Sequence, residues 1–129
     1  EPYRRQRQMC IRDSRERNST FMEHLDMDTI IMELIVNAGN ARSLAIEAIR
    51  AAREGDYEKA DSLLAECDQA MNDAHNVQTE LIQQELNGEK QPLSLLAVHA
   101  QDHVMNAMTV RDLALEIIAM SKELRKLAQ

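Results

Sequence analysis

The sequence has almost no aromatic side chains, with two Tyr, one Phe and no Trp among 129 residues. Aromatic and β-branched residues are the ones that β-sheets favour, so their scarcity argues against a sheet protein. The core must instead be built from Leu, Ile, Val, Ala and the eight Met, which is typical of helices packed on helices. The chain length fits one domain with a single core.

Paired cysteines and long apolar runs are also missing. Cys10 and Cys67 are far apart and form no Cys-x-x-Cys pair, which excludes a disulfide framework and a zinc site and indicates a reducing cytoplasm. A bilayer-spanning helix needs roughly 20 apolar residues. Glu33 interrupts "IIMELIV" and His99 interrupts "LLAVHA", so we expect no membrane insertion.

Positive charge is scarce outside the first residues. Residues 1–17 hold six Arg and three acidic residues, so the rest of the chain holds nine basic and 19 acidic residues, a net charge of −10. Nucleic acids and anionic membrane surfaces require concentrated Lys and Arg, so neither is an expected partner.

The opening segment "EPYRRQRQMCIRDSRERNST" differs in composition from everything after it. It carries Arg without an apolar segment, so it is not a secretory signal. We expect residues 1–21 to be disordered, or to be linker or adapter sequence ahead of a natural start near Met22. The domain is then expected to span residues 22–129.

Three stretches have the apolar spacing of amphipathic helices. The first runs from about Asp26 to Arg53, where "REGD" ends it; the second begins at Asp56 and ends at "NGEKQP"; the third follows Ser94, a plausible N-cap. Short connections make neighbouring helices antiparallel. The sequence therefore predicts an all-α, antiparallel three-helix bundle.

An apolar seam of alternating three- and four-residue steps runs through the third stretch, and polar residues replace part of it. At three successive seam positions stand His99, His103 and Asn106. The apolar positions of this seam are Leu96, Val110, Leu113, Ile117, Met120, Leu124 and Leu127. Apolar stripes on more than one helix face favour a homo-oligomer over a monomer.

The histidines allow three interpretations, because His99, Asp102 and His103 share one helix face. They could fix helix register in a non-catalytic oligomeric module, or ligate a metal in a helical-bundle enzyme. Alternatively, an imidazole nitrogen could carry a phosphoryl group, with His103 and Gln101 as hydrogen-bond donors. For that role the Asp102 carboxylate is an objection, because it would repel the phosphate.

The segment "LAVHAQDHVM" resembles the active-site segment of the lactose/cellobiose/chitobiose family of enzyme IIA components of the bacterial phosphoenolpyruvate-dependent sugar phosphotransferase system. The resemblance extends through "IIMELIVNAGNARSLAIEAI", "REGDYEKADSLL" and "AHNVQTELI", and covers roughly residues 26–127. A bare His-x-x-Asp-His would be weak evidence, whereas this ordered set of segments is specific.

The resemblance implies a homotrimer of three-helix protomers with His99 as the phosphorylated residue. It implies that His99 receives the group from HPr and passes it to the IIB component, for uptake of a cellobiose-, chitobiose- or lactose-type disaccharide. Asp102 matches an aspartate near the three-fold axis, where three carboxylates meet a cation, typically Mg²⁺, which would answer the repulsion objection. His103 and Gln101 match positions that line the groove beside His99.

Overall fold

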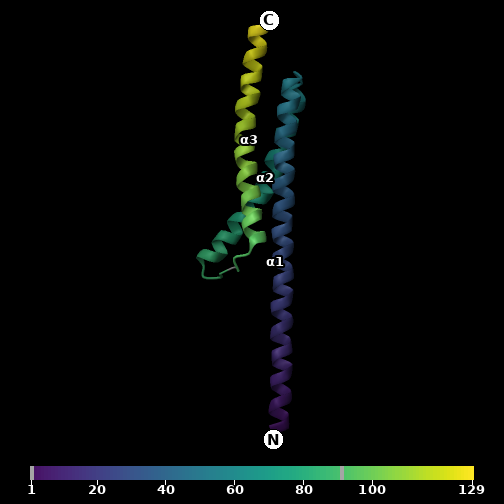
Figure 1. Ribbon diagram of the computed structural model, residues 1–129, viewed down its shortest axis with the longest axis vertical. Helices are drawn as coiled ribbons and strands as arrows, with labels where there is room; N and C mark the ends of the chain where they lie inside the picture. The colour runs from purple at the N-terminus through teal and green to yellow at the C-terminus, as the bar shows by residue number, and fades with distance from the viewer. Residues whose placement is uncertain (1, 91) are drawn as a thin grey trace. The chain divides into compact units, whose positions relative to one another are not determined.

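The structure is a computed structural model that describes the backbone of residues 2–90 and 92–129, and side chains from residue 26 onward with the same gap. It contains three helices: α1 (Pro2–Arg53), α2 (Tyr57–Leu86) and α3 (Leu95–Ala128) (Figure 1). The chain divides into two units, Glu1–Ile30 and Ile31–Gln129. Among the described residues, no helix combines the length and hydropathy that a bilayer crossing requires.

The helix predicted to start near Asp26 begins much earlier, at Pro2. Pro is favoured at the first helical position, and no Gly or further Pro follows it before Gly39. Nothing in residues 3–25 therefore stops a helix, which the search for an apolar face could not reveal. The side chains of residues 1–25 lie outside the described residues, and the boundary between residues 21 and 22 stays a prediction.

In the second unit, the all-α antiparallel architecture is confirmed, and both later helices have N-caps, of which Ser94 was the predicted one. Asp56 caps α2, with its carboxylate accepting from the Lys59 backbone N–H at 3.1 Å. Ser94 caps α3 in the same way, accepting from the Ala97 N–H at 3.1 Å. Each cap satisfies a backbone donor that the first helical turn leaves free, which fixes where the helix starts.

The core of this unit is made mostly of small side chains. Its fully buried large residues are Leu34, Val104 and Cys67, and the Cys67 thiol donates to the Ala41 carbonyl at 3.1 Å. Small residues let helix backbones approach closely, so the helices pack tightly without aromatic rings. The buried alanines are Ala38, Ala41, Ala45, Ala48, Ala51, Ala52, Ala60, Ala70, Ala74, Ala100, Ala107 and Ala114.

Polar contacts join the α1–α2 turn to the C-terminal part of α3. The Ser121 hydroxyl donates to the Ala52 carbonyl at 3.1 Å, and the Tyr57 hydroxyl lies 3.1 Å from Oγ of Ser121. The guanidinium of Arg125 lies over the Tyr57 ring, 5.8 Å from its centre. Gly55, in the turn, has φ of 84°, a backbone conformation that favours glycine, and the Arg125 guanidinium lies where a Cβ would stand.

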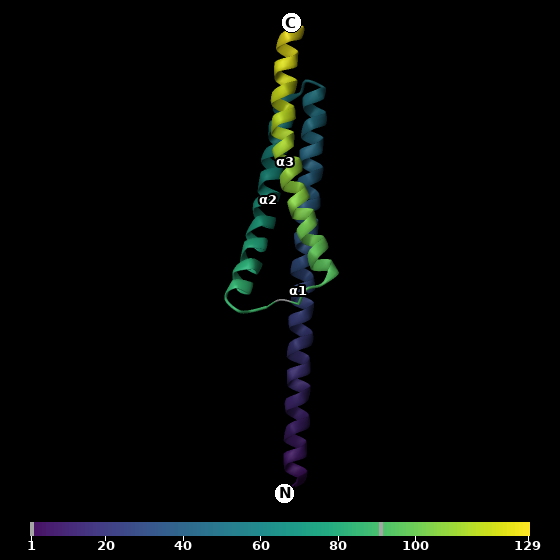
Figure 2. The same ribbon diagram turned by 60° about the vertical axis from the view of Figure 1, so that its left-hand side comes forward.

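The predicted seam of α3 does not face the core of its own protomer. Within residues 31–129, the three helices lie alongside one another, and α2 diverges from α3 toward Leu86 (Figures 1 and 2). The α3 residues buried between them are Ala100, Val104, Ala107, Ala114 and Ile118. Small side chains point inward, and the larger residues of the seam form an exposed apolar stripe: Leu113 (55% exposed), Ile117 (40%), Met120 (60%), Leu124 (64%) and Leu127 (84%).

Candidate functional site

His99 and His103 form a direct contact one helical turn apart near the start of α3. Their Nε2 atoms are 3.0 Å apart, and the rings meet edge to face with centres 4.4 Å apart. His99 is exposed and His103 is half-buried. The pairing follows from the four-residue spacing, which places both rings on one face of the helix. The structure therefore confirms that the two imidazoles share one helix face, as their spacing predicts.

The contact constrains the chemistry of the pair. A hydrogen bond between two ring nitrogens needs one N–H and one lone pair, so one ring must present an unprotonated Nε2 to the other. An unprotonated imidazole nitrogen is a nucleophile, and the second ring's N–H is a donor already placed beside it. The pair therefore combines a nitrogen that can attack an electrophile with an N–H that can donate a hydrogen bond to the oxygens of that electrophile.

Asp102 lies on the same side of α3, with an exposed carboxylate. Across residues 26–90 and 92–129, no group of three His, Cys, Asp or Glu side chains is arranged to hold a metal ion. Divalent cations such as Mg²⁺ take several oxygen ligands, and a single carboxylate supplies too few. Cation binding at Asp102 therefore requires oxygen ligands from outside the protomer.

Gln101 lies apart from the two histidines. It is two residues from each of them, a turn of about 200° around the helix, so it faces α2 rather than the histidine face. There its Oε1 accepts from Nε2 of Gln78 at 2.5 Å, and Gln78 itself is only 9% exposed. The structure thus brings His103 to His99, and Gln101 to Gln78. Gln78 is a polar residue at helical spacing among the apolar residues of α2, but its partner depends on how α2 packs on α3.

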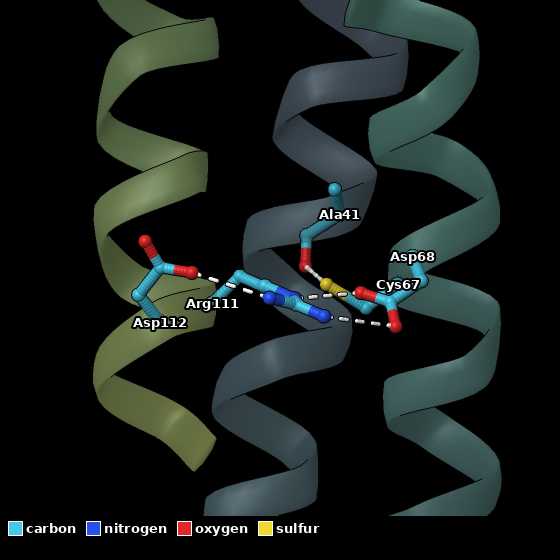
Figure 3. A network of polar contacts seen from close by, with 5 residues as sticks. All are labelled: Ala41, Cys67, Asp68, Arg111 and Asp112. Carbon is cyan, nitrogen blue, oxygen red and sulfur yellow. Dashed lines mark hydrogen bonds and ion pairs between the residues drawn. The ribbon is translucent and has the colours of Figure 1, made fainter. Parts of the chain in front are cut away.

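A second polar cluster lies about two turns further along α3. Arg111 clamps Asp68 of α2 with two hydrogen bonds, Nε to Oδ1 at 2.7 Å and Nη2 to Oδ2 at 3.1 Å, and its Nη1 reaches Asp112 at 3.2 Å (Figure 3). The hydrogen bonds that Arg111 donates to the Asp68 carboxylate raise the pKa of its guanidinium. No signal in the sequence marks this contact, because Arg111 and Asp68 have the spacing of ordinary charged surface residues. The cluster ties α2 to α3 and lies beside the Cys67–Ala41 contact, without reaching the histidines.

Comparisons with known proteins agree on one family. The family model described as "PTS system, Lactose/Cellobiose specific IIA subunit" matches residues 29–122. The lichenan-specific phosphotransferase enzyme IIA component of Bacillus subtilis (strain 168) is 50% identical over 99 residues, which cover 77% of this chain and 90% of that protein.

Solved structures show the same relationship. The crystal structure of the PTS cellobiose-specific enzyme IIA from Bacillus anthracis matches with a TM-score of 0.74 and 49% identity, covering 76% of this chain and 90% of that one. The IIA(Chitobiose) chain in the solution structures of its complex with HPr, from Escherichia coli, matches with a TM-score of 0.66 and 40% identity, covering 75% and 94%.

Proposed function

The chain belongs to the lactose/cellobiose-specific IIA subunits of the sugar phosphotransferase system and is a phosphotransferase component, and we propose that His99 carries the phosphoryl group. The single observation that carries this proposal is the His99–His103 pair, in which a nucleophilic nitrogen and a donor lie 3.0 Å apart on an exposed helix face. His99 is exposed on the surface of α3, which suits a residue that must meet two proteins in turn.

The proposed reaction is two displacements at phosphorus. A ring nitrogen of His99 attacks the phosphoryl group of phosphohistidine in HPr, so a new N–P bond forms as the donor's N–P bond breaks. A cysteine thiolate of the IIB component then attacks the same phosphorus, and His99 is regenerated. Such transfers pass through a loose transition state, so the protein contributes mainly alignment and hydrogen bonds to the oxygens.

His103 and Gln101 are the proposed donors to those oxygens. His103 already lies against Nε2 of His99, so a small movement of its ring would place an N–H against a phosphoryl oxygen. Gln101 faces away from His99 of its own chain, so its amide would act on the phosphoryl group of a neighbouring protomer.

The exposed apolar stripe of α3 supports the proposed homotrimer. His99 and His103 continue the series of positions occupied by Leu113, Ile117 and Met120, residues that remain about half exposed in the protomer. Contiguous exposed apolar surface of this kind marks an association site. Covering the stripe with further copies would put His99 at the boundary between protomers, where a neighbour's residues can reach it.

Mg²⁺ is the proposed cation, held by Asp102 of each of three chains. The carboxylate is a hard oxygen ligand and is exposed on the side of α3 that carries the stripe, so it fits a shared site. The cation would neutralise three like charges brought together. Native mass spectrometry of Asp102→Asn tests this: we expect the protein to lose its bound cation, about one per three chains, while His99 still accepts a phosphoryl group. Retention of the cation by the variant would contradict the assignment.

The partners and cargo follow from the relatives. Their names specify cellobiose, lichenan and chitobiose, and one structure contains HPr. We propose that this chain works in the cytoplasm between HPr and a sugar-specific IIB component, for a disaccharide of the cellobiose or chitobiose class in preference to lactose.

The decisive experiment is intact mass after incubation with phosphoenolpyruvate, enzyme I and HPr. We expect one acid-labile phosphoryl adduct on the parent protein and none on His99→Gln. His75→Gln is the matched control, because His75 is an exposed histidine on α2 that takes no part in the His99–His103 contact. An assembled parent protein without an adduct would reject the carrier. That result would leave a register-setting oligomeric module or a metal-dependent bundle, and metal analysis would separate these.

A further inference from the structure

The contact between α2 and α3 contains a buried glutamine where packing alone favours a hydrocarbon. Gln78 lies on the buried face of α2, between Ala74 and Leu81. Among the described residues, it is the one polar side chain that is buried with the apolar core. Burying an amide is unfavourable unless its hydrogen bonds are made. A leucine would fill this position without that requirement, so the amide needs an explanation beyond packing.

The hydrogen bond of Gln78 determines which way the Gln101 amide faces. A glutamine side chain has one accepting oxygen and one NH₂ group with two donors. Gln78 donates from Nε2 to Oε1 of Gln101, so the contact occupies the acceptor of Gln101. Because the amide is planar, its NH₂ group is then turned away from Gln78. Gln101 is half-buried, so this donor side is not sealed inside the protomer.

We propose that Gln78 is a positioning residue that holds the Gln101 amide with its NH₂ side available to a phosphoryl group on His99 of a neighbouring protomer. This inference rests on the function proposed above. Phosphoryl oxygens only accept hydrogen bonds, so the NH₂ side attracts them and the carbonyl side repels them. The oxygen and the NH₂ group of a free amide are nearly equal in size, so steric effects alone would not select the productive orientation. The Gln78 donor selects it.

The sharpest test reverses the hydrogen bond without changing its shape. In Gln78→Glu, an ionised carboxylate can only accept, so it would draw the Gln101 NH₂ group toward itself and turn the carbonyl oxygen outward. Gln78→Met keeps the length and removes the hydrogen bond, which leaves the amide free to rotate. We expect transfer from phospho-HPr to His99 to fall about tenfold in Gln78→Glu, which corresponds to about 1.4 kcal/mol, and about threefold in Gln78→Met.

Gln83→Glu is the matched control, since it makes the same charge change at an exposed position of α2. Transfer is followed by rapid quench and intact mass over a range of phospho-HPr concentrations. A donor turned toward the phosphoryl group acts on the transfer step, so we expect the maximal rate to fall with the half-saturating HPr concentration unchanged. A general weakening of docking would instead raise that concentration.

Nitrogen-15 NMR of the Gln101 side-chain amide gives an independent signature. We expect its NH₂ signals to shift on phosphorylation of the parent protein, and to be displaced before phosphorylation in Gln78→Glu, because the carboxylate already binds them. A Gln101→Leu variant assigns the signals. It should also abolish the effect of Gln78→Met, since the two residues act through one amide.

The outcomes separate the two proposals. If the parent accepts a phosphoryl group and Gln78→Glu transfers as fast as Gln83→Glu, the positioning role is wrong while the carrier function stands. If the parent is never phosphorylated, the carrier function fails and this inference fails with it. Should Gln78→Glu not fold, additive losses from Gln78→Met and Gln101→Leu would overturn the positioning role.

Discussion

Replacing Leu113 with Glu should dissociate the proposed trimer while leaving the protomer helical. Leu113 is 55% exposed in the protomer and lies within the apolar stripe of α3. Complete burial of a leucine contributes about 1.5–3 kcal/mol, so covering the exposed half contributes about 1 kcal/mol per copy. Three copies give about 3 kcal/mol per trimer, or roughly a hundredfold in the assembly constant. A carboxylate placed against apolar surface adds a further penalty, so a hundredfold is the minimum.

Leu115→Glu is the matched control for this prediction. Leu115 is a leucine of the same helix, 42% exposed, two residues away and on the opposite side from the stripe. Sedimentation equilibrium over a concentration series measures the assembly, and circular dichroism measures the helix content. If the two variants assemble alike, or if the parent is a monomer at all concentrations, the stripe is not the surface that joins the copies.

Two further predictions concern the contact of α2 with its neighbours. Burial raises the pKa of the Cys67 thiol, so the folded protein keeps this proton at a pH where the unfolded chain loses it. The free energy of unfolding should therefore not depend on the Cys67 thiol below about pH 8.5 and should fall above that pH. Urea unfolding measures this, and Cys67→Ser should lack the decline. Parallel pH profiles for the parent protein and the variant would contradict the prediction. The Arg111–Asp68 clamp is partly exposed, so a double-mutant cycle with Arg111→Met and Asp68→Asn should give a coupling of about 1 kcal/mol. A coupling of zero would mean that solvent competes fully with the clamp.

Helix existence and helix starts were readily predicted where local chemistry determines them. The caps at Asp56 and Ser94 each act on a backbone N–H three residues away, so the sequence alone contains both partners. The amphipathic helix predicted from Asp56 is also present as α2, and its Ala60, Leu64 and Cys67 are buried at the three- and four-residue steps of one helix face. In α1, the start at Pro2 was missed because helix continuation there needs no apolar face.

The two sides of α3 could not be distinguished by periodicity. Both sides carry apolar residues at helical spacing, and hydrophobicity favours the larger ones as the core. The protomer instead buries Ala100, Val104 and Ala107 against its other helices, because close packing selects small side chains. For the site, the His99–His103 contact was predictable from a four-residue spacing. The Gln78–Gln101 pair joins residues 23 apart in the sequence, so it required the packing of two helices.

Hydrogen bonds spread along α3 affect the direction in which His99 points. Alanine contacts hold helices close but have little directionality, so they oppose small rotations of α3 about its own axis only weakly. Polar contacts at Gln101, Arg111 and Ser121 resist such rotations, and the first and last of them lie about 30 Å apart along the helix. Shifting the packing by one residue would swing His99 through about 100°, from the exposed side toward the interior. The apolar core therefore determines which side of α3 faces inward, and the directional contacts hold the reactive ring at its angle about the helix axis.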